Sequence, residues 1–141
     1  MARKPVVVLD TNVFVSGLIS PGGIPGAILQ HFRAGRFEIV TSKEQIREIR
    51  AVLRRPSLAR ALPRGTPGEV MRFFARFKRL TRVYNPPRLR WDFGDRNDHF
   101  LLDLAVHAKT DFLVTGDKAL RNLLLVGSCA VATPVEFIAR L

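Results

Sequence analysis

The sequence is poor in the residues that build disulfide-bonded or membrane-embedded proteins. Its one cysteine, Cys129, excludes an internal disulfide and a cysteine-cluster metal site. Only four consecutive apolar residues, Val6 to Leu9, follow the basic start, which is too few for a signal peptide, and no other stretch approaches the length of a membrane span. We therefore expect a cytoplasmic protein that has no contact with a membrane.

Acidic residues are scarce relative to basic ones. The 141 residues include 23 Lys and Arg but only 12 Asp and Glu, a formal net charge of +11. Most of the excess lies in residues 50–96, which contain 13 basic and three acidic residues. Eighteen of the basic residues are arginines, whose planar guanidinium matches phosphate oxygens. The charge predicts a polyanionic partner, of which nucleic acid is the commonest; the alternative is that the arginines mainly keep the protein soluble.

The rest of the composition is that of a globular protein. With 47% hydrophobic and 25% charged residues, we expect one domain spanning residues 1–141. Apolar runs at residues 6–9, 37–40 and 112–114 are typical of strands buried on both faces of a parallel sheet. Helical patterns alternate with these runs, so the sequence predicts an α/β sandwich.

Two helices have clear signals in the sequence. Ser42 and Gln45 have the spacing of a capping box, in which each side chain bonds the backbone of the other residue, and the helix that follows should stop before Pro56. A second helix, from Asp98 to about Lys109, is apolar almost all round. We expect it to lie centrally in the core.

A further helix is expected to open near residues 66–67 and to be amphipathic. Its apolar stripe consists of Val70, Phe73, Phe74 and Phe77, while Arg72, Arg76 and Arg79 fall on its other side. The stripe predicts a core contact. The three arginines are candidates for binding a phosphate backbone.

Carboxylates follow two of the predicted strands. Asp10 comes directly after residues 6–9, and Asp117 comes shortly after residues 112–114. Since the carboxyl ends of parallel strands line the crevice where ligands bind, both should face one rim. Asp98, at the start of the predicted central helix, is a candidate for the same rim, and Glu48 borders the core on the helix that Ser42 opens.

Carboxylates brought together repel one another unless a cation neutralises them. Ligand sets made only of oxygen select hard ions such as Mg²⁺ or Mn²⁺. Such an ion polarises phosphates and lowers the pKa of a bound water, which can then attack phosphorus. The alternative for Asp98 and Asp117 is that each is a helix N-cap. Glu48 taken alone is typical of a solvated helix residue.

A second constellation is the stripe of His99, Asp103 and His107, spaced four residues apart. This spacing suits a zinc site on one face of a helix. We favour the alternative that these residues form the solvated side of an otherwise apolar helix.

Taken in order, four segments resemble the PIN domain family. They are residues 6–17 with Asp10-Thr-Asn12, residues 46–49 with Glu48, residues 95–105 with Asp95-Arg-Asn-Asp98, and residues 113–118 with Thr115-Gly-Asp117. The similarity is greatest to toxin components of bacterial and archaeal toxin–antitoxin systems, relatives of the VapC-type ribonucleases. It runs from Val6 to Phe137, nearly the whole chain.

The resemblance implies a three-layer α/β/α sandwich around a parallel sheet and an endoribonuclease that depends on Mg²⁺ or Mn²⁺. Asp10, Glu48, Asp98 and Asp117 would be the acidic quartet that holds the ion and carries catalysis. Asn12 and Thr115 match the polar residues beside it, and Asp95 is an additional acid. Expected partners are RNA and an antitoxin; a homodimer or larger homo-oligomer is left open. Phe73, Phe74 and Phe77 would be a candidate docking surface for the antitoxin, although we favour an ordinary core contact for them. The family's acidic turn often has one more carboxylate than Asp95-Arg-Asn-Asp98 provides, which puts a second ion in doubt.

Two other functions remain open on the sequence. One is a non-catalytic module that binds nucleic acid or an antitoxin and keeps its acids as helix caps. The other is a phosphatase with Asp10 as nucleophile. Against the phosphatase, such enzymes usually have a second Asp two residues on, where this chain has Asn12.

Overall fold

The computed structural model describes residues 3–61, 67–92 and 98–141 and has a single mixed sheet at its centre. The strand order is β3-β2-β1-β4-β6-β5. The strands are β1 (Val6–Leu9), β2 (Glu38–Ser42), β3 (Arg82–Tyr84), β4 (Phe112–Val114), β5 (Leu125–Val126) and β6 (Cys129–Ala132). All neighbours pair in parallel except β5 and β6, which are antiparallel. The expected parallel sheet is thus confirmed, with the addition of one antiparallel edge strand.

Successive residues of the central strand β1 serve the two faces of the sheet. Val7 pairs with Ile39 of β2 and Phe112 of β4, so β1 has a neighbour on both sides. Val7 and Leu9 belong to the core on one face, and Val8 belongs to the core on the other. A strand covered on both faces needs apolar residues at every position, which explains why β1 lacks polar alternation.

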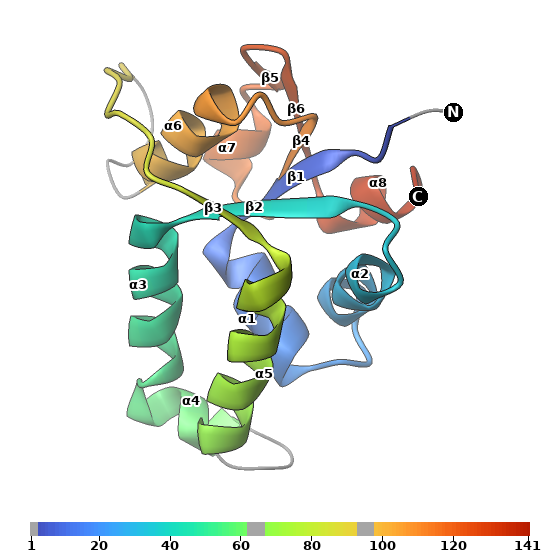
Figure 1. The fold of residues 1–141 in the computed structure, drawn as a ribbon, viewed down its shortest axis with the longest axis vertical. Coiled ribbons are helices and arrows are strands. Elements are labelled where there is room, and N and C mark those ends of the chain that lie inside the picture. Colours follow the sequence, from blue (N-terminus) through green and yellow to red (C-terminus); the bar gives the residue numbers. More distant parts are fainter. Residues whose placement is uncertain (1–2, 62–66, 93–97) are drawn as a thin grey trace.

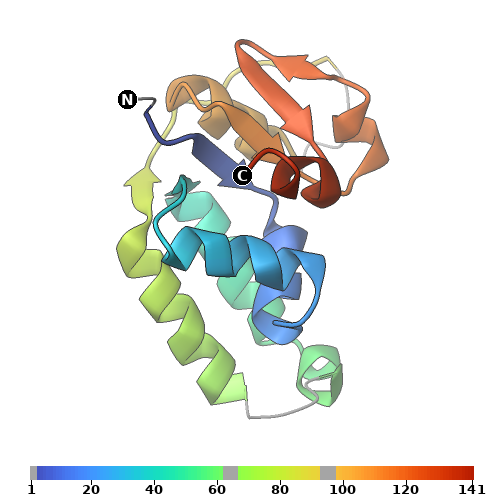
Figure 2. The same ribbon diagram turned by 90° about the vertical axis from the view of Figure 1, so that its right-hand side faces the viewer.

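Helices cover both faces of the sheet, which confirms the three-layer arrangement (Figures 1 and 2). The first face is covered by α1 (Thr11–Ile19), α2 (Ile24–Arg33), α3 (Lys43–Leu53), α5 (Pro67–Leu80) and α8 (Pro134–Ile138), with α4 (Pro56–Ala61) following α3. The second is covered by α6 (His99–His107) and α7 (Lys118–Arg121). As expected, α6 lies centrally in its core, with Leu102 and Leu104 fully buried.

No single helix among the described residues is long and apolar enough to cross a membrane. Taken together, α1 and α2 have the length and apolar composition of a membrane span, but the two helices are bent by 91° relative to each other.

Two expectations about helices need correction. Ser42 Oγ accepts from the Gln45 backbone amide at 3.1 Å, but the Gln45 side chain does not return to Ser42; it bonds Thr41 and the Leu9 carbonyl instead. On α5, Phe74 and Phe77 are buried and pack edge to face on Phe14. Phe73, expected in the same core stripe, is 46% exposed. The part of the helix surface that faces the core includes Val70, Phe74 and Phe77 but does not extend to Phe73.

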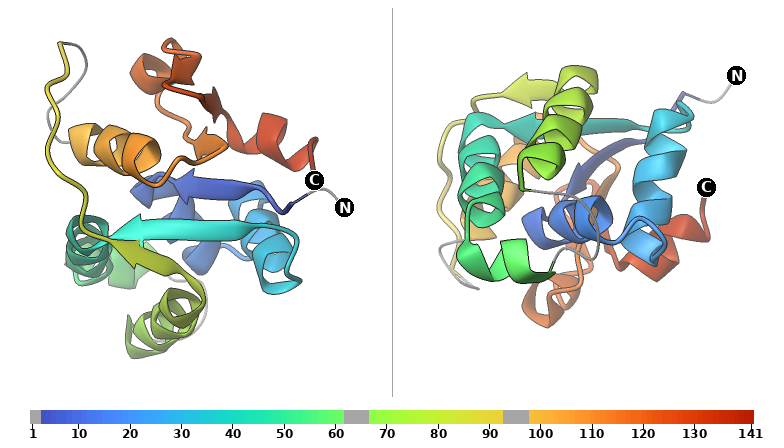
Figure 3. Two further views of the ribbon diagram at one scale, coloured as in Figure 1. Left: turned by 45° about the horizontal axis from the view of Figure 1, so that its top comes forward. Right: turned by 90° about the horizontal axis from the view of Figure 1, so that it is seen from below.

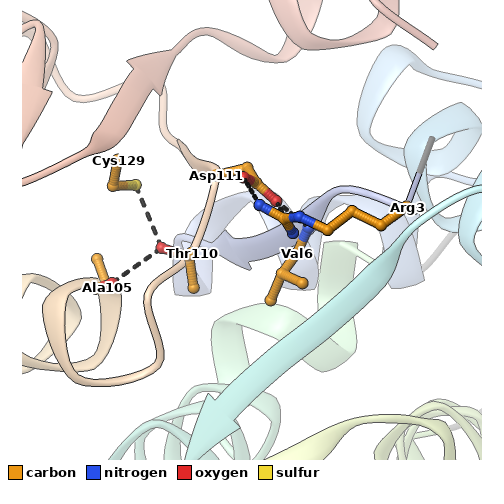
Figure 4. A network of polar contacts seen from close by, with 6 residues as sticks. All are labelled: Arg3, Val6, Ala105, Thr110, Asp111 and Cys129. Atoms are coloured by element: carbon orange, nitrogen blue, oxygen red, sulfur yellow. Dashed lines mark hydrogen bonds and ion pairs between the residues drawn. The ribbon is translucent and has the colours of Figure 1, made fainter.

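A polar network ties the chain together at the amino ends of the strands (Figure 4). Asp111, just before β4, receives two hydrogen bonds from the Arg3 guanidinium, at 2.7 and 2.9 Å, and one from the Val6 amide at 2.8 Å. Next to it, the buried Thr110 hydroxyl contacts the Ala105 carbonyl and the Cys129 thiol. The network secures the start of β1 against β4, at the edge opposite the predicted carboxylate rim.

Candidate metal centre

Asp10 lies where β1 ends and α1 begins. Its backbone amide donates to the Val114 carbonyl at 2.9 Å, which extends the pairing of β1 with β4 by one residue. The side chain is 7% exposed, and its Oδ2 accepts from the Thr115 hydroxyl at 2.6 Å. Its Oδ1 accepts from the Asn12 amide at 3.4 Å, a long capping bond for α1. Asp10 is therefore held in one orientation by donors at the ends of both β1 and β4.

Thr115 connects Asp10 to Asp117. The fully buried Thr115 hydroxyl donates to Asp10 and accepts from the Asp117 backbone amide at 3.0 Å. Asp117 Oδ1 in turn accepts from the amides of Ala119 and Leu120 at the start of α7. Asp117 is thus the N-cap of α7, as expected. Its carboxylate also lies close enough to Asp10 for its charge to raise the pKa of the Asp10 carboxyl.

Glu48 reaches the same region from α3. It lies one turn beyond Gln45, whose buried side-chain amide donates to the Leu9 carbonyl, the residue before Asp10. The Thr11 hydroxyl faces Glu48 and lowers the pKa of its carboxyl as a nearby dipole. Among the described residues, Thr11 Oγ1 is nonetheless buried with no partner at ordinary hydrogen-bond geometry. The contact is therefore electrostatic rather than a formed hydrogen bond.

The electrostatics of the acids link all four expected residues. Burial raises the pKa of Asp10, hydrogen bonds from Thr115 and Asn12 oppose this, and the charge of Asp117 adds to it. Burial also raises the pKa of Glu48, with further contributions from the charges of Asp10 and Asp98. Asp98, at the start of α6, makes no capping hydrogen bond from its side chain. Asp10 therefore lies near Asp117 and Glu48, and Glu48 lies near Asp98; the assignment of these four residues to one site stays a prediction.

These acids are close enough to interact, but they do not form a closed cage. In the described parts of the chain, no group of three or more His, Cys, Asp or Glu side chains is near enough together to hold a metal ion. Mg²⁺ requires less than this, because it usually keeps several waters and binds through one or two carboxylates. The oxygen-only donors, their mutual repulsion and the buried, unbonded Thr11 hydroxyl fit such an ion.

A cleft of about 370 Å³ opens beside Asp10 and Asp117. Its lining also includes Asn12 and Ser16 of α1, Gly116, and Pro25 and Pro134 at the starts of α2 and α8. Asn12, expected beside the acids, is exposed at this opening, and Thr115 lies beneath it. The cleft gives a phosphate access to Asp10 and Asp117 from solvent, whereas Glu48 and Asp98 do not line it.

The other expected site residues lie elsewhere. Asp95 is outside the described residues. Arg72 and Arg76 border a hollow of about 220 Å³ with Glu69 and Phe73, and the Arg76 guanidinium lies over the Phe73 ring, 5.8 Å from its centroid. Arg79 is exposed on the same helix. These arginines flank a groove on α5 and do not line the carboxylate cleft.

The stripe of His99, Asp103 and His107 is neither a metal site nor a uniformly solvated face. Asp103 is 5% exposed, and its Oδ1 accepts from the Leu89 amide at 3.0 Å and Trp91 Nε1 at 2.8 Å. The expectation that it faces solvent is therefore wrong. Leu89 and Trp91, which come before α6 in the chain, cover this position of the helix. His107 is exposed and packs edge to face on Tyr84.

The sequence did not single out Gln45 or Asp103 for their contacts. The sequence assigned Gln45 to a capping box. Gln45 stands beside Ile46 and Ile49 on the buried side of α3, however, and a polar side chain in such a position needs hydrogen-bond partners inside the protein. Asp103 stands within the apolar run 100–105, where a carboxylate needs buried donors.

Comparisons with known proteins agree with this architecture. The model of the PIN domain family matches residues 6–119. An uncharacterized protein of Methanocaldococcus jannaschii is 32% identical over 143 residues, which cover 96% of this chain and 90% of that protein. A crystal structure of VapBC2 from Rickettsia felis, bound to a DNA fragment from its promoter, superimposes with a TM-score of 0.63 at 13% identity, covering 91% of this chain and 98% of the matched chain. The chain belongs to the PIN domain family.

Proposed function

We propose that this protein is a metal-dependent endoribonuclease that cleaves RNA phosphodiester bonds. PIN domains are generally nucleases. The observation that carries the proposal is the buried Asp10 carboxylate, oriented by Thr115 next to Asp117 at the mouth of an open cleft. A carboxylate removed from water in this way is costly unless it serves a bound cation.

Each residue has a defined part in this proposal. Asp10 and Asp117 would hold Mg²⁺ or Mn²⁺, and Glu48 and Asp98 would complete its coordination or orient the attacking water. Thr115 fixes the direction of Asp10 through its 2.6 Å hydrogen bond, as partners of metal ligands commonly do. The ion would supply the activated water and neutralise charge on the phosphate. Asn12 stands at the cleft opening, where it would contact the substrate.

The test is RNA cleavage by Asp10→Ala, which we expect to fall to background while unfolding remains cooperative. Thr115→Val keeps every carboxylate but removes the bond that orients Asp10, and should cost about 10- to 100-fold. Glu38→Gln removes a carboxylate at the amino end of β2, away from the carboxyl rim, and serves as the charge-matched control. Cleavage by Asp10→Ala at the wild-type rate would refute the site.

A specific observation also favours a non-catalytic module as second candidate. Asp117 caps α7, and the described acids do not form a preassembled metal cluster. Isothermal titration with Mn²⁺ separates the two functions. The nuclease should release heat that Asp98→Asn abolishes or strongly reduces, whereas the module should show no such signal in either protein.

We further propose that the protein is a cytoplasmic toxin neutralised by an antitoxin. An apolar groove of about 250 Å³ between α1, α2 and α5 supports a protein partner. Phe73 lines it with Phe77, and Arg33 lies at its edge. A second copy of the chain would compete for such a surface. Phe73→Ser should weaken binding of a small protein encoded by a neighbouring reading frame and leave RNA cleavage unchanged.

A further inference from the structure

The residues that follow β3 run along the carboxyl side of the sheet. Residues 85–92 have no regular secondary structure, and they pass between α3 and α6 on the side toward which β1 and β2 point (Figure 3, left). Tyr84 at one end and Trp91 at the other pack against the core of the second face. We call residues 85–92 the strap.

Asp103 fixes the strap from beneath. Its buried Oδ1 accepts from the Leu89 amide and from Trp91 Nε1. A buried carboxylate that satisfies two donors in one short segment specifies where that segment lies. Arg90 lies between the two bonded residues in the chain and Arg88 directly precedes them, and both arginines are exposed.

The fixed strap encloses a small polar pocket of about 110 Å³ against the start of α3. Arg47 of α3 and Arg88 of the strap both line it, together with Asn85 and Ser42. Ser42 ends β2, the strand next to β1, so the pocket and Asp10 open on the same rim of the sheet. Arg47 directly precedes Glu48 on α3.

We propose that this pocket, defined by Arg47, Asn85 and Arg88, binds an RNA phosphate next to the one that is cleaved, and that Asp103 is a positioning residue that holds Arg88 there. The inference rests on the proposed nuclease function and adds a substrate subsite to it. Two guanidinium groups and an amide supply donors for phosphate oxygens. Glu44 and Asp103 also line the pocket and offset the arginine charge while it is empty, and Asp103 Oδ1 is already bonded to the Leu89 amide and Trp91 Nε1.

The test uses a fluorescein-labelled single-stranded oligouridylate without added divalent metal, so that binding is measured without cleavage. Removing one phosphate contact should reduce the slope of log affinity against log salt by about 0.7. Arg47→Gln with Arg88→Gln should therefore flatten the slope. Arg36→Gln with Arg54→Gln, two exposed arginines away from the rim, should leave the slope as it is. Equal slopes in the two double variants would overturn the pocket.

Trp91, the only tryptophan, reports on the strap. Asp103→Ala should shift its emission to the red and lower RNA affinity severalfold, while Asp103→Asn, which keeps the acceptor oxygen, should restore both. Trp91→Phe keeps an aromatic ring against the core but removes the Nε1 donor, and it should also lower affinity, which covers the case in which Asp103→Ala does not fold. If Asp103→Ala shifts the Trp91 emission to the red but binds RNA with unchanged affinity, the positioning role of Asp103 is overturned.

The outcomes separate this inference from the proposed function. If the wild type cleaves RNA and the pocket variants bind it normally, only the subsite fails. If the wild type neither binds nor cleaves RNA, the proposed function fails as well. If the protein binds polyglutamate instead of RNA, and Arg47→Gln with Arg88→Gln weakens that binding, the pocket binds an acidic protein segment and the proposal is overturned.

Discussion

At the scale of single residues, buried polar side chains decide how the rim is held. Gln45 joins α3 to two strands, since its side chain accepts from Thr41 Oγ1 at 2.6 Å and donates to the Leu9 carbonyl. Thr115 joins Asp10 to Asp117 in the same manner. Both hold neighbouring groups of the rim in place through hydrogen bonds that span the sheet.

Gln45→Leu should destabilise the protein markedly. The substitution keeps a similar volume but leaves the buried Thr41 hydroxyl without the acceptor it donates to and removes one donor from the Leu9 carbonyl, which together cost about 1–3 kcal/mol. Urea denaturation followed by circular dichroism measures the loss. Gln30→Leu, at an exposed position of α2, is the control and should change stability by less than about 0.5 kcal/mol.

Asp111 makes a pH-dependent contribution to stability. Burial raises its pKa, but hydrogen bonds from Val6 and Arg3 and the charge of Arg3 outweigh this, so the pKa of Asp111 lies below the ordinary value of an aspartate. A depressed carboxyl pKa stabilises the fold above the unfolded pKa, and the stabilisation is lost as pH falls through the folded pKa.

Asp111→Asn should therefore be less stable than the wild type at neutral pH, by about 1 kcal/mol or less because the Arg3 side chain is 70% exposed. The difference should stay constant down to about pH 4 and shrink below it. Thermal unfolding of the two proteins across this range gives the measurement. A difference that grows toward acid would contradict the assignment.

At the scale of elements, the packing of α2 against the chain before it depends on a missing side chain. A Cβ at Gly26 would collide with the Pro21 carbonyl and its neighbouring backbone atoms. A Cβ at Gly17 on α1 would lie 2.7 Å from the Leu29 side chain and 2.8 Å from the Pro25 carbonyl oxygen, so a side chain is excluded there too. These two glycines allow α1 and α2 to turn sharply and remain in contact.

Gly26→Ala should thus lower stability by about 1–3 kcal/mol, because backbone atoms must move to admit the methyl group. Gly22→Ala, where nothing lies within 4 Å of the added carbon, should have little effect. Differential scanning calorimetry of both variants compares them directly. Equal melting temperatures would show that the turn before α2 yields without cost.

At the scale of the whole molecule, the exposed arginines of α5 lie apart from the carboxylate cleft. Asp10 and Asp117 line the cleft at the carboxyl rim, whereas Arg72 and Arg76 border the hollow beside Phe73. A polyanion held by arginines and cut at the rim must extend over both regions. RNA affinity should accordingly fall steeply with salt.

Replacing Arg72, Arg76 and Arg79 together by Gln should flatten that salt dependence, by about 0.7 in slope for each phosphate that the variant no longer binds. Fluorescence anisotropy with the same oligouridylate at several salt concentrations measures the slope. Retention of the wild-type slope in this triple variant would confine the RNA-binding surface to the rim and leave α5 to a protein partner.

The sequence by itself determined the central strands, the main helices and the layered arrangement, because buried parallel strands and amphipathic helices follow from the local spacing of apolar residues. The tertiary structure alone decided that Gln45 turns toward Leu9, that Phe73 stays exposed and that Asp103 is covered by the strap. Periodicity marks Gln45 and Asp103 as polar residues at buried positions, but it does not say which atoms they bond, because those partners lie in other segments of the chain. Asp10 lies between these cases: its place after β1 was evident from the sequence, whereas its partner Thr115 is 105 residues away and meets it only because β1 and β4 pair.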